Sequence, residues 1–232
     1  MSAMKQAYFI TATGTDLGKT WLTAGLAGLL RQRGEAVCVV KPVMSGYDES
    51  RPWESDAGVL LKNVGDGDMK SPAGVTPDAI AAIAPWRFAA PLSPDRAAAL
   101  EGKRIDFDEL VAWCRDRIAA TEGTLLIEGI GGVMVPLDEG HTVRDWIAAL
   151  HVPVVLVAGS YLGSLSHTLT ALAALREVGV VPVAVVVNES AGGDVRLADV
   201  AASLTPHLGD AVLVVMGRND LAGMTRLADA LA

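Results

Sequence analysis

The stretch that decides the fold is AYFITATGTDLGKT, residues 7–20. It begins with apolar and β-branched residues, continues through a loop rich in Thr and Gly, and ends in Gly-Lys-Thr. An Ala- and Leu-rich segment follows as far as Arg33 and stops at Gly34, a residue typical of helix C-termini. A strand, a Gly-containing loop and a helix in this order are the setting of a phosphate-binding loop.

Such a loop has two means of holding an anion. Its backbone N–H groups and the positive end of the helix point at phosphate oxygens. Gly18 lets the backbone approach, Lys19 reaches the β- and γ-phosphates, and the Thr20 hydroxyl is placed for Mg²⁺. The usual pattern has Gly where this chain has Thr13, with Gly14 one place later. An ordinary turn with a solvated lysine is the alternative, but the flanking strand and helix favour polyphosphate binding.

Further strand-like and helix-like segments alternate along the chain. The strand-like runs are continuously apolar, which is typical of strands covered on both faces. The alternation predicts an α/β, P-loop NTPase-like fold, with a mostly parallel sheet between helices. We expect one domain over residues 1–232, in which 42–104 forms functional loops. The predicted strands are Tyr8–Thr11, Ala36–Val40, Thr124–Glu128, Val154–Ala158, Val183–Asn188 and Ala211–Met216, and the predicted helices are Thr20–Arg33, a segment opened by Asp106, Ser164–Val178, Leu197–Leu208 and Met224–Leu231.

Composition excludes several classes of protein. The 232 residues carry a net charge of −8 and are 51% hydrophobic, which excludes disorder and disfavours a nucleic-acid partner. The longest apolar runs, Val152–Gly159 and Val178–Val187, are about half the ~20 residues of a membrane span, so we expect no membrane partner. The N-terminus shows no signal-peptide core. Cys38 and Cys114 lie in apolar patterns, and we expect buried free thiols in a cytoplasmic protein.

Polar residues follow other predicted strands at the same edge of the sheet. Glu128 ends an apolar strand before Gly129 and Gly131, a Walker-B-like arrangement that predicts metal ligation beside the phosphate loop. Lys41 ends the second strand and is either a solvated strand end or a second cation near the phosphates. Asn188 ends a later strand and either reads an adenine base or caps a turn.

Two further segments leave alternatives open. For Asp56 a helix cap is the simpler interpretation, and a second metal carboxylate is the alternative. Residues 160–167 join a strand to a helix, where exposed N–H groups form a second anion site or Ser simply caps the helix. The four His residues lack the spacing of a zinc site, and no nucleophile-elbow pattern occurs.

Taken together, these motifs resemble the dethiobiotin synthetases, ATP-dependent enzymes that close the ureido ring in biotin synthesis. The resemblance implies that 7,8-diaminononanoate takes up CO₂ as a carbamate and that ATP phosphorylates this carbamate. The second amine then attacks the carbonyl and expels phosphate. The resemblance also implies a homodimer with the substrate at the subunit interface. The motifs that carry it are TGTDLGKT at 13–20, KPVMSG at 41–46, SDA at 55–57, FAAPLSP at 88–94, EGIGG at 128–132 and LG at 162–163.

The resemblance also assigns roles to residues. Lys19 and Lys41, with Thr15, form the catalytic set, and the two lysines stabilise charge on the phosphoryl group and the carbamate. Mg²⁺ is held by Thr20, Asp56 and Glu128. The implied nucleotide-binding residues are Asp16, Leu17, Gly18, Lys19, Thr20, Trp21, Asp56, Glu128, Gly129, Gly131 and Asn188, and the substrate-binding residues are Thr15, Lys41, Ser45 and, from the neighbouring subunit, Leu162, Gly163 and Ser164.

This chain departs from the family pattern at three of these positions or their neighbours. Many relatives have Glu at the position of Asp16, Lys at that of Tyr161 and Asn at that of Ser166. The C-terminal strand also runs into Met216-Gly217-Arg218-Asn219 without the Pro-Trp pair that some relatives have near the base. The departure at Asp16 bears on the reach of the acid, those at Tyr161 and Ser166 bear on the carboxylate site, and the C-terminal segment bears on the base preference.

Two other functions fit a phosphate loop. One is a partitioning-type ATPase switch regulated by partners, which uses an extra lysine five residues before the loop's Lys, where this chain has Gly14. The other is a cofactor amidation domain, which needs a glutaminase nucleophile, and neither cysteine lies at a nucleophile turn. The sequence favours the synthetase over both.

Overall fold

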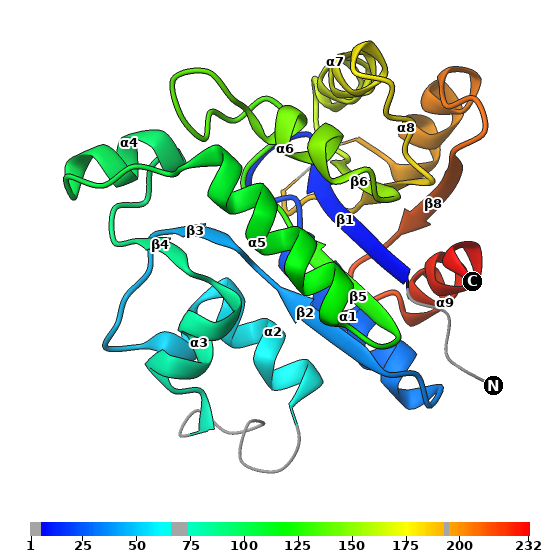
Figure 1. The fold of residues 1–232 in the computed structure, drawn as a ribbon. Helices are drawn as coiled ribbons and strands as arrows, with labels where there is room; N and C mark the ends of the chain where they lie inside the picture. Colours follow the sequence, from blue (N-terminus) through cyan, green and yellow to red (C-terminus); the bar gives the residue numbers. More distant parts are fainter. Residues whose placement is uncertain (1–5, 66–73, 193–194) are drawn as a thin grey trace.

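A six-stranded parallel sheet forms the centre of the protein in the computed structural model, which describes residues 6–65, 74–192 and 195–232 (Figure 1). The strand order is β2-β5-β1-β6-β7-β8, and all neighbouring strands pair in parallel. The predicted parallel sheet is therefore confirmed. Its strands are β1 (Gln6–Ala12), β2 (Val37–Val40), β5 (Thr124–Glu128), β6 (Val154–Gly159), β7 (Ala184–Asn188) and β8 (Val212–Met216).

Helices cover both faces of this sheet. In β1, Ile10 packs into one apolar cluster with α1 and α9, whereas Phe9 packs into another with α5, α6, α7 and α8. Figure 1 shows α5 and α6 crossing one face, with α1 behind the sheet. This two-sided burial explains why the strand sequences are continuously apolar. The helices named here are α1 (Lys19–Gln32), α5 (Phe107–Ala120), α6 (Val143–Leu150), α7 (Ser164–Glu177), α8 (Leu197–Leu204) and α9 (Leu221–Leu231).

The segment 42–104, expected to be loops, contains regular structure, so that expectation is wrong in part. β3 (Val43–Ser45) and β4 (Trp86–Phe88) form a separate two-stranded parallel sheet. These elements span only three to nine residues, too few for apolar periodicity to reveal them. The helices of this segment are α2 (Asp56–Val64), α3 (Pro77–Ile83) and α4 (Pro94–Leu100), preceded by a 3₁₀ turn at Pro52–Glu54.

Most predicted element boundaries lie close to the observed ones. Thr124–Glu128 is confirmed at both ends. The helix predicted to reach Leu208 instead ends at Leu204. Pro206 lacks the N–H that an α-helix needs, and the chain continues there as a 3₁₀ turn over Thr205–His207. The last helix begins at Leu221, where the Asp220 side chain caps it by accepting a backbone N–H at 2.9 Å. A proline at one helix end and a capping Asp at another therefore account for these two differences.

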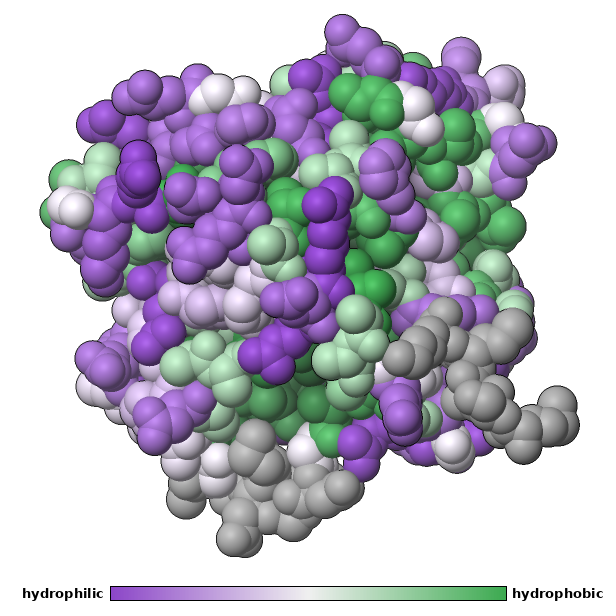
Figure 2. Space-filling model, in the orientation of Figure 1, coloured by the Kyte–Doolittle hydropathy of each residue, from purple (hydrophilic) through white to green (hydrophobic). Residues whose placement is uncertain are grey.

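The two cysteines differ in environment. Cys114 is buried as expected, and burial raises the pKa of its thiol to about 12. Cys38 is exposed, so the expectation of a buried thiol is wrong there; it lies on β2, an edge strand of the sheet. The described part of the chain contains no helix with the length and apolarity that a membrane crossing requires. On the face shown in Figure 2, hydrophilic residues are interspersed with apolar ones.

Candidate functional site

The phosphate loop occupies the turn between β1 and α1. Gly18 precedes the helix with φ 86°, a conformation that favours glycine, and a Cβ there would lie 2.3 Å from Nδ2 of Asn188. Asp16 also has a positive φ, 58°, which Asp adopts more readily than longer side chains do. The shape of the loop thus requires Gly18 and suits the shorter acid at position 16.

Lys19 is folded back over this loop. Its Nζ donates to the carbonyl oxygens of Gly14 at 3.1 Å and Gly131 at 2.8 Å, and only 7% of the residue is exposed. Burial, together with the nearby Lys41 charge, lowers the pKa of Lys19 to about 8. Both hydrogen-bond acceptors are formally neutral, so a bound phosphate would bring a counter-charge that stabilises the ammonium.

A buried ion cluster lies beside the loop. Lys41 Nζ contacts Glu128 Oε1 at 2.7 Å and Asp56 Oδ2 at 3.1 Å, and it donates to the Gly129 carbonyl at 2.8 Å. Lys41 and Glu128 are almost completely buried, and the interpretation of Lys41 as a solvated strand end is therefore wrong. Burial acts to lower the pKa of Lys41, but Glu128 and Asp56 outweigh it, so that the pKa is raised and the lysine is charged.

Three oxygen-bearing side chains of this cluster suit a hard divalent cation. Thr20 Oγ1 donates to Glu128 Oε1 at 2.7 Å, while the buried Oε2 of Glu128 has no hydrogen-bond partner. Burial acts to raise the pKa of Asp56, but Lys41 outweighs it and the pKa is lowered, so Asp56 is a carboxylate. Carboxylate and hydroxyl oxygens are the donors that Mg²⁺ takes from proteins, and the residues present fit this ion.

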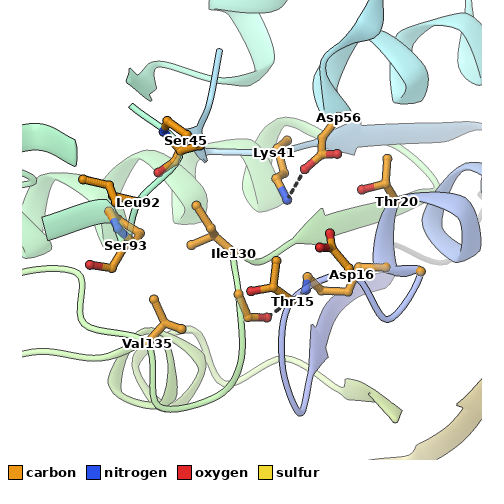
Figure 3. Close-up of a pocket in the computed structure, with 15 residues that line it drawn as sticks. Thr15, Asp16, Thr20, Lys41, Ser45, Asp56, Leu92, Ser93, Ile130 and Val135 are labelled. Carbon is orange, nitrogen blue, oxygen red and sulfur yellow. Dashed lines mark hydrogen bonds and ion pairs between the residues drawn. The ribbon is translucent and has the colours of Figure 1, made fainter. Parts of the chain in front are cut away.

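Asp56 is not the cap of its helix. The neighbouring Ser55 is the N-cap of α2, and its hydroxyl accepts from the Gly58 N–H at 3.1 Å. Asp56 is the first helical residue, and its carboxylate points to Lys41 instead (Figure 3). The simpler interpretation from sequence, a helix cap, is therefore wrong.

Loop and cluster open into one cavity of about 860 Å³. Figure 3 shows Ser45, Leu92 and Ser93 on one side of it and Asp16 and Thr20 on the other, with Lys41 between them. The cavity thus joins the phosphate loop to the β3–β4 sheet. Its lining residues are Thr15, Asp16, Gly18, Lys19, Thr20, Lys41, Ser45, Asp56, Pro91, Leu92, Ser93, Pro94, Ile130, Gly131 and Val135.

Six of these lining residues were not assigned to the site from sequence: Pro91, Leu92, Ser93, Pro94, Ile130 and Val135. The first four belong to a motif quoted above only for its resemblance, and they lie between β4 and the first turn of α4. The signal available there was Ser93-Pro94, a cap residue followed by Pro at the first helical position.

Other predicted residues lie behind the cavity. Leu17 and Trp21 pack against the apolar cluster on the α1 side of the sheet. Gly129 supplies the carbonyl that Lys41 binds, and its N–H donates to the Ile10 carbonyl at 2.9 Å. The Asn188 amide donates to the Leu17 carbonyl at 3.0 Å, so this strand end is anchored to the phosphate loop.

The predicted second anion site lies apart from this cavity. Leu162, Gly163 and Ser164 form the start of α7, and none of them is among the lining residues. Leu162 is 92% exposed, whereas Ser164 is buried and its hydroxyl has no hydrogen-bond partner. Tyr161, at a position where the chain departs from the family pattern, has its hydroxyl 2.8 Å from Nδ1 of His167.

Solved structures share the fold at low sequence identity. HypB from Helicobacter pylori, solved in complex with nickel, is 16% identical with a TM-score of 0.54, over 99% of this chain and 86% of that one. The cell division ATPase MinD of Pyrococcus furiosus is 14% identical with a TM-score of 0.54, over 98% of both chains. These likenesses confirm the P-loop NTPase-like fold class and nothing further.

Sequence relatives are much nearer. A protein-family model described as an AAA domain matches residues 6–215. An ATP-dependent dethiobiotin synthetase BioD from Acidiphilium cryptum is 50% identical over 87% of this chain and 88% of its own length. Proteins of the same name from Methylobacterium nodulans and Caulobacter sp. are 46% and 44% identical over 89% and 97% of this chain, and over 91% and 94% of their own lengths. The chain therefore belongs to the ATP-dependent dethiobiotin synthetase family.

Proposed function

We propose that this protein uses ATP to close the ureido ring of dethiobiotin from 7,8-diaminononanoate and CO₂. One observation carries the proposal beyond the family name. The phosphate loop with Lys19 and the buried cluster around Lys41 open into the same cavity, whose other wall comes from β3–β4. A nucleotide and a second small substrate can therefore meet at the two lysines.

The reaction needs charge stabilisation and positioning, and no protein nucleophile. An amine of the substrate adds to CO₂ and forms a carbamate, whose oxygen takes the γ-phosphoryl group of ATP and releases ADP. The second amine attacks the carbonyl carbon, and the C–O bond to phosphate breaks. Lys19 and Lys41 stabilise the negative charge on the phosphoryl oxygens and on the carbamate. Holding carbamate, ATP and amine together removes much of the entropic part of the barrier.

Thr20, Asp56 and Glu128 are the residues that would hold Mg²⁺. Bound to the nucleotide, this ion neutralises charge on the β- and γ-phosphates. The unpartnered Oε2 of Glu128 supports the assignment, because a buried carboxylate oxygen without a partner is costly.

The substrate side of the cavity combines polar and apolar groups. Ser45 has a buried hydroxyl without a hydrogen-bond partner, and Thr15 lies across the cavity from it. We assign both residues to the binding of the diamine or its carbamate. Leu92, Ile130 and Val135 line the same space and suit the alkyl chain of the substrate.

We further propose that the active form is a homodimer, in which Leu162, Gly163 and Ser164 receive the substrate carboxylate from the neighbouring subunit. Their position outside the cavity of their own chain, the exposure of Leu162 and the unpartnered Ser164 hydroxyl support this assignment.

For the nucleotide base we propose Asn188, which adjoins the loop at Leu17. The free thiols of Cys38 and Cys114 fit a cytoplasmic location.

The experiment that tests the function is an ATPase assay with the purified protein. Phosphate release from ATP should require both 7,8-diaminononanoate and bicarbonate, and dethiobiotin should form in step with phosphate. Omitting either substrate is the control. Hydrolysis that proceeds without them and is stimulated by DNA or lipid would support a partitioning-type switch instead, an alternative that the sequence relatives do not favour.

A further inference from the structure

The ammonium of Lys41 lies where its three protons are all used. Lysine has three N–H donors and no acceptor. The three acceptors of Lys41 are Oε1 of Glu128, Oδ2 of Asp56 and the carbonyl of Gly129, at 2.7, 3.1 and 2.8 Å. Two of these belong to the carboxylates proposed for the divalent cation, so Lys41 already occupies one oxygen of each of them.

A divalent cation on the same carboxylates would meet this ammonium at close range. With Lys41 the pair Glu128 and Asp56 carries a net charge of −1, and without it −2. Like charges at contact distance repel strongly in a site of reduced dielectric constant, and Glu128 is completely buried. A lysine and a divalent cation therefore compete for these carboxylates.

We propose that Lys41 is the resident counter-ion of Glu128 and Asp56, and that it keeps divalent cations from binding there until a nucleotide enters. This inference rests on the proposed function, since it takes Thr20, Asp56 and Glu128 as the metal residues. It adds a consequence: the cation arrives together with the polyphosphate and not before it.

A bound polyphosphate would allow the cation to replace Lys41 at the two carboxylates, an exchange that needs new acceptors for the ammonium and more ligands for the cation. Lys41 lines the same cavity as Thr15 and Lys19, so phosphate oxygens bound at the loop would share this cavity with its ammonium. Those oxygens replace the carboxylates as acceptors for Lys41, and they add ligands for the cation. After the exchange, the ammonium of Lys41 is paired with phosphate oxygens and the two carboxylates are paired with the cation.

The test is Mn²⁺ binding by the whole protein without nucleotide, measured by the electron paramagnetic resonance signal of free Mn²⁺. The wild type should bind Mn²⁺ weakly, and Lys41→Met should bind it at least about ten-fold more tightly. Lys103→Met is the matched control, because it removes the same charge from an exposed lysine that follows α4 and should leave Mn²⁺ binding at the wild-type level.

Two further variants separate charge from side-chain shape. Lys41→Arg keeps the charge and should bind Mn²⁺ as weakly as the wild type. Lys41→Met/Glu128→Gln removes a metal ligand as well and should lose the gained affinity. If Lys41→Met is unstable, its melting temperature should still rise with Mn²⁺ concentration while that of the wild type does not, because a ligand of the folded state stabilises it.

Equal Mn²⁺ affinity of the wild type and Lys41→Met would overturn the exchange. The proposed metal residues are tested separately with ATP present, by measuring the Mn²⁺ retained with the protein in equilibrium dialysis against a blank that holds ATP and Mn²⁺ but no protein. The wild type should bind Mn²⁺ when ATP is present. If Glu128→Gln loses this binding, Glu128 is supported as a metal residue whatever the outcome for Lys41. If it is unchanged in Glu128→Gln, the metal assignment itself is wrong.

Discussion

Glu128 and Asp56 share one lysine but differ in how deeply they lie. The Glu128 side chain is completely buried, whereas 48% of the Asp56 side chain is exposed. Loss of Glu128 would leave Lys41 buried with one carboxylate that is itself half in water. Loss of Asp56 leaves the stronger, buried pair in place. The two carboxylates should therefore respond differently to substitution.

Asp56→Ala should keep the fold and raise the Mg²⁺ concentration needed for half-maximal turnover several-fold, because one metal ligand is lost. Glu128→Ala should instead lower the free energy of unfolding by about 3–5 kcal/mol, the typical effect of breaking a buried ion pair. Magnesium titrations of turnover and urea denaturation measure the two effects. An unchanged Mg²⁺ dependence in Asp56→Ala would return this residue to a purely structural role.

Among the elements, the segment between β4 and α4 depends on a side chain at the far end of α4. Oε1 of Glu101 accepts from the backbone N–H of Ala89 at 2.7 Å, and Lys103 binds its other oxygen at 2.7 Å. Ala89 follows directly on β4 and leads into Pro91–Pro94, which line the cavity. We therefore expect Glu101 to position the wall that we propose for the substrate, although Glu101 is not among the lining residues.

Glu101→Ala should raise the KM for 7,8-diaminononanoate several-fold while leaving the KM for ATP unchanged, because the phosphate loop is anchored elsewhere. Glu101→Gln, which keeps an oxygen acceptor for Ala89, should restore most of the affinity. Glu122→Ala, an exposed glutamate at the opposite end of the sheet, is the control for loss of charge. Parallel increases in both KM values would show a general loosening of the fold.

The sequence predicts the phosphate loop and the strand that ends at Glu128 well, because each is specified by a continuous run of residues. It does not predict β3 and β4, whose three residues each gain their conformation from pairing with one another. The orientation of Asp56 is likewise invisible in sequence, since Ser55 takes the capping role that either residue could fill. The pairing of β3 with β4 and the orientation of Asp56 depend on contacts between segments distant in sequence, and no local sequence pattern predicts such contacts.

At the scale of the whole molecule, a net charge of −8 coexists with a site for anions. In the proposed function this site binds anions through short-range groups, namely loop N–H groups, Lys19 and Lys41, whose influence does not depend on the sum of charges. The proposed association between subunits concerns the whole molecule too, and we expect the exposed Leu162 to lie where the subunits meet. That residues 1–232 form a single domain stays a prediction.

Leu162→Asp should convert the proposed homodimer to a monomer, because it places a charge at the start of α7 where we expect the subunits to meet. Light scattering coupled to size-exclusion chromatography measures the mass, and the KM for the diamine should rise with dissociation while ATP binding persists. Leu100→Asp, which alters another exposed leucine at the end of α4, is the control. A variant that remains dimeric with a normal KM would contradict the proposed interface.

The separation of the small β3–β4 sheet from the six-stranded one has an evolutionary consequence. The nucleotide side of the cavity is built on α1, β1 and β5, while Ser45 and Pro91–Pro94 come with the small sheet and its flanking turns. Substitutions in the small sheet can alter the length or polarity of the accepted molecule without disturbing the phosphate loop. A lineage of such proteins could therefore acquire new substrates while its energy source stayed the same.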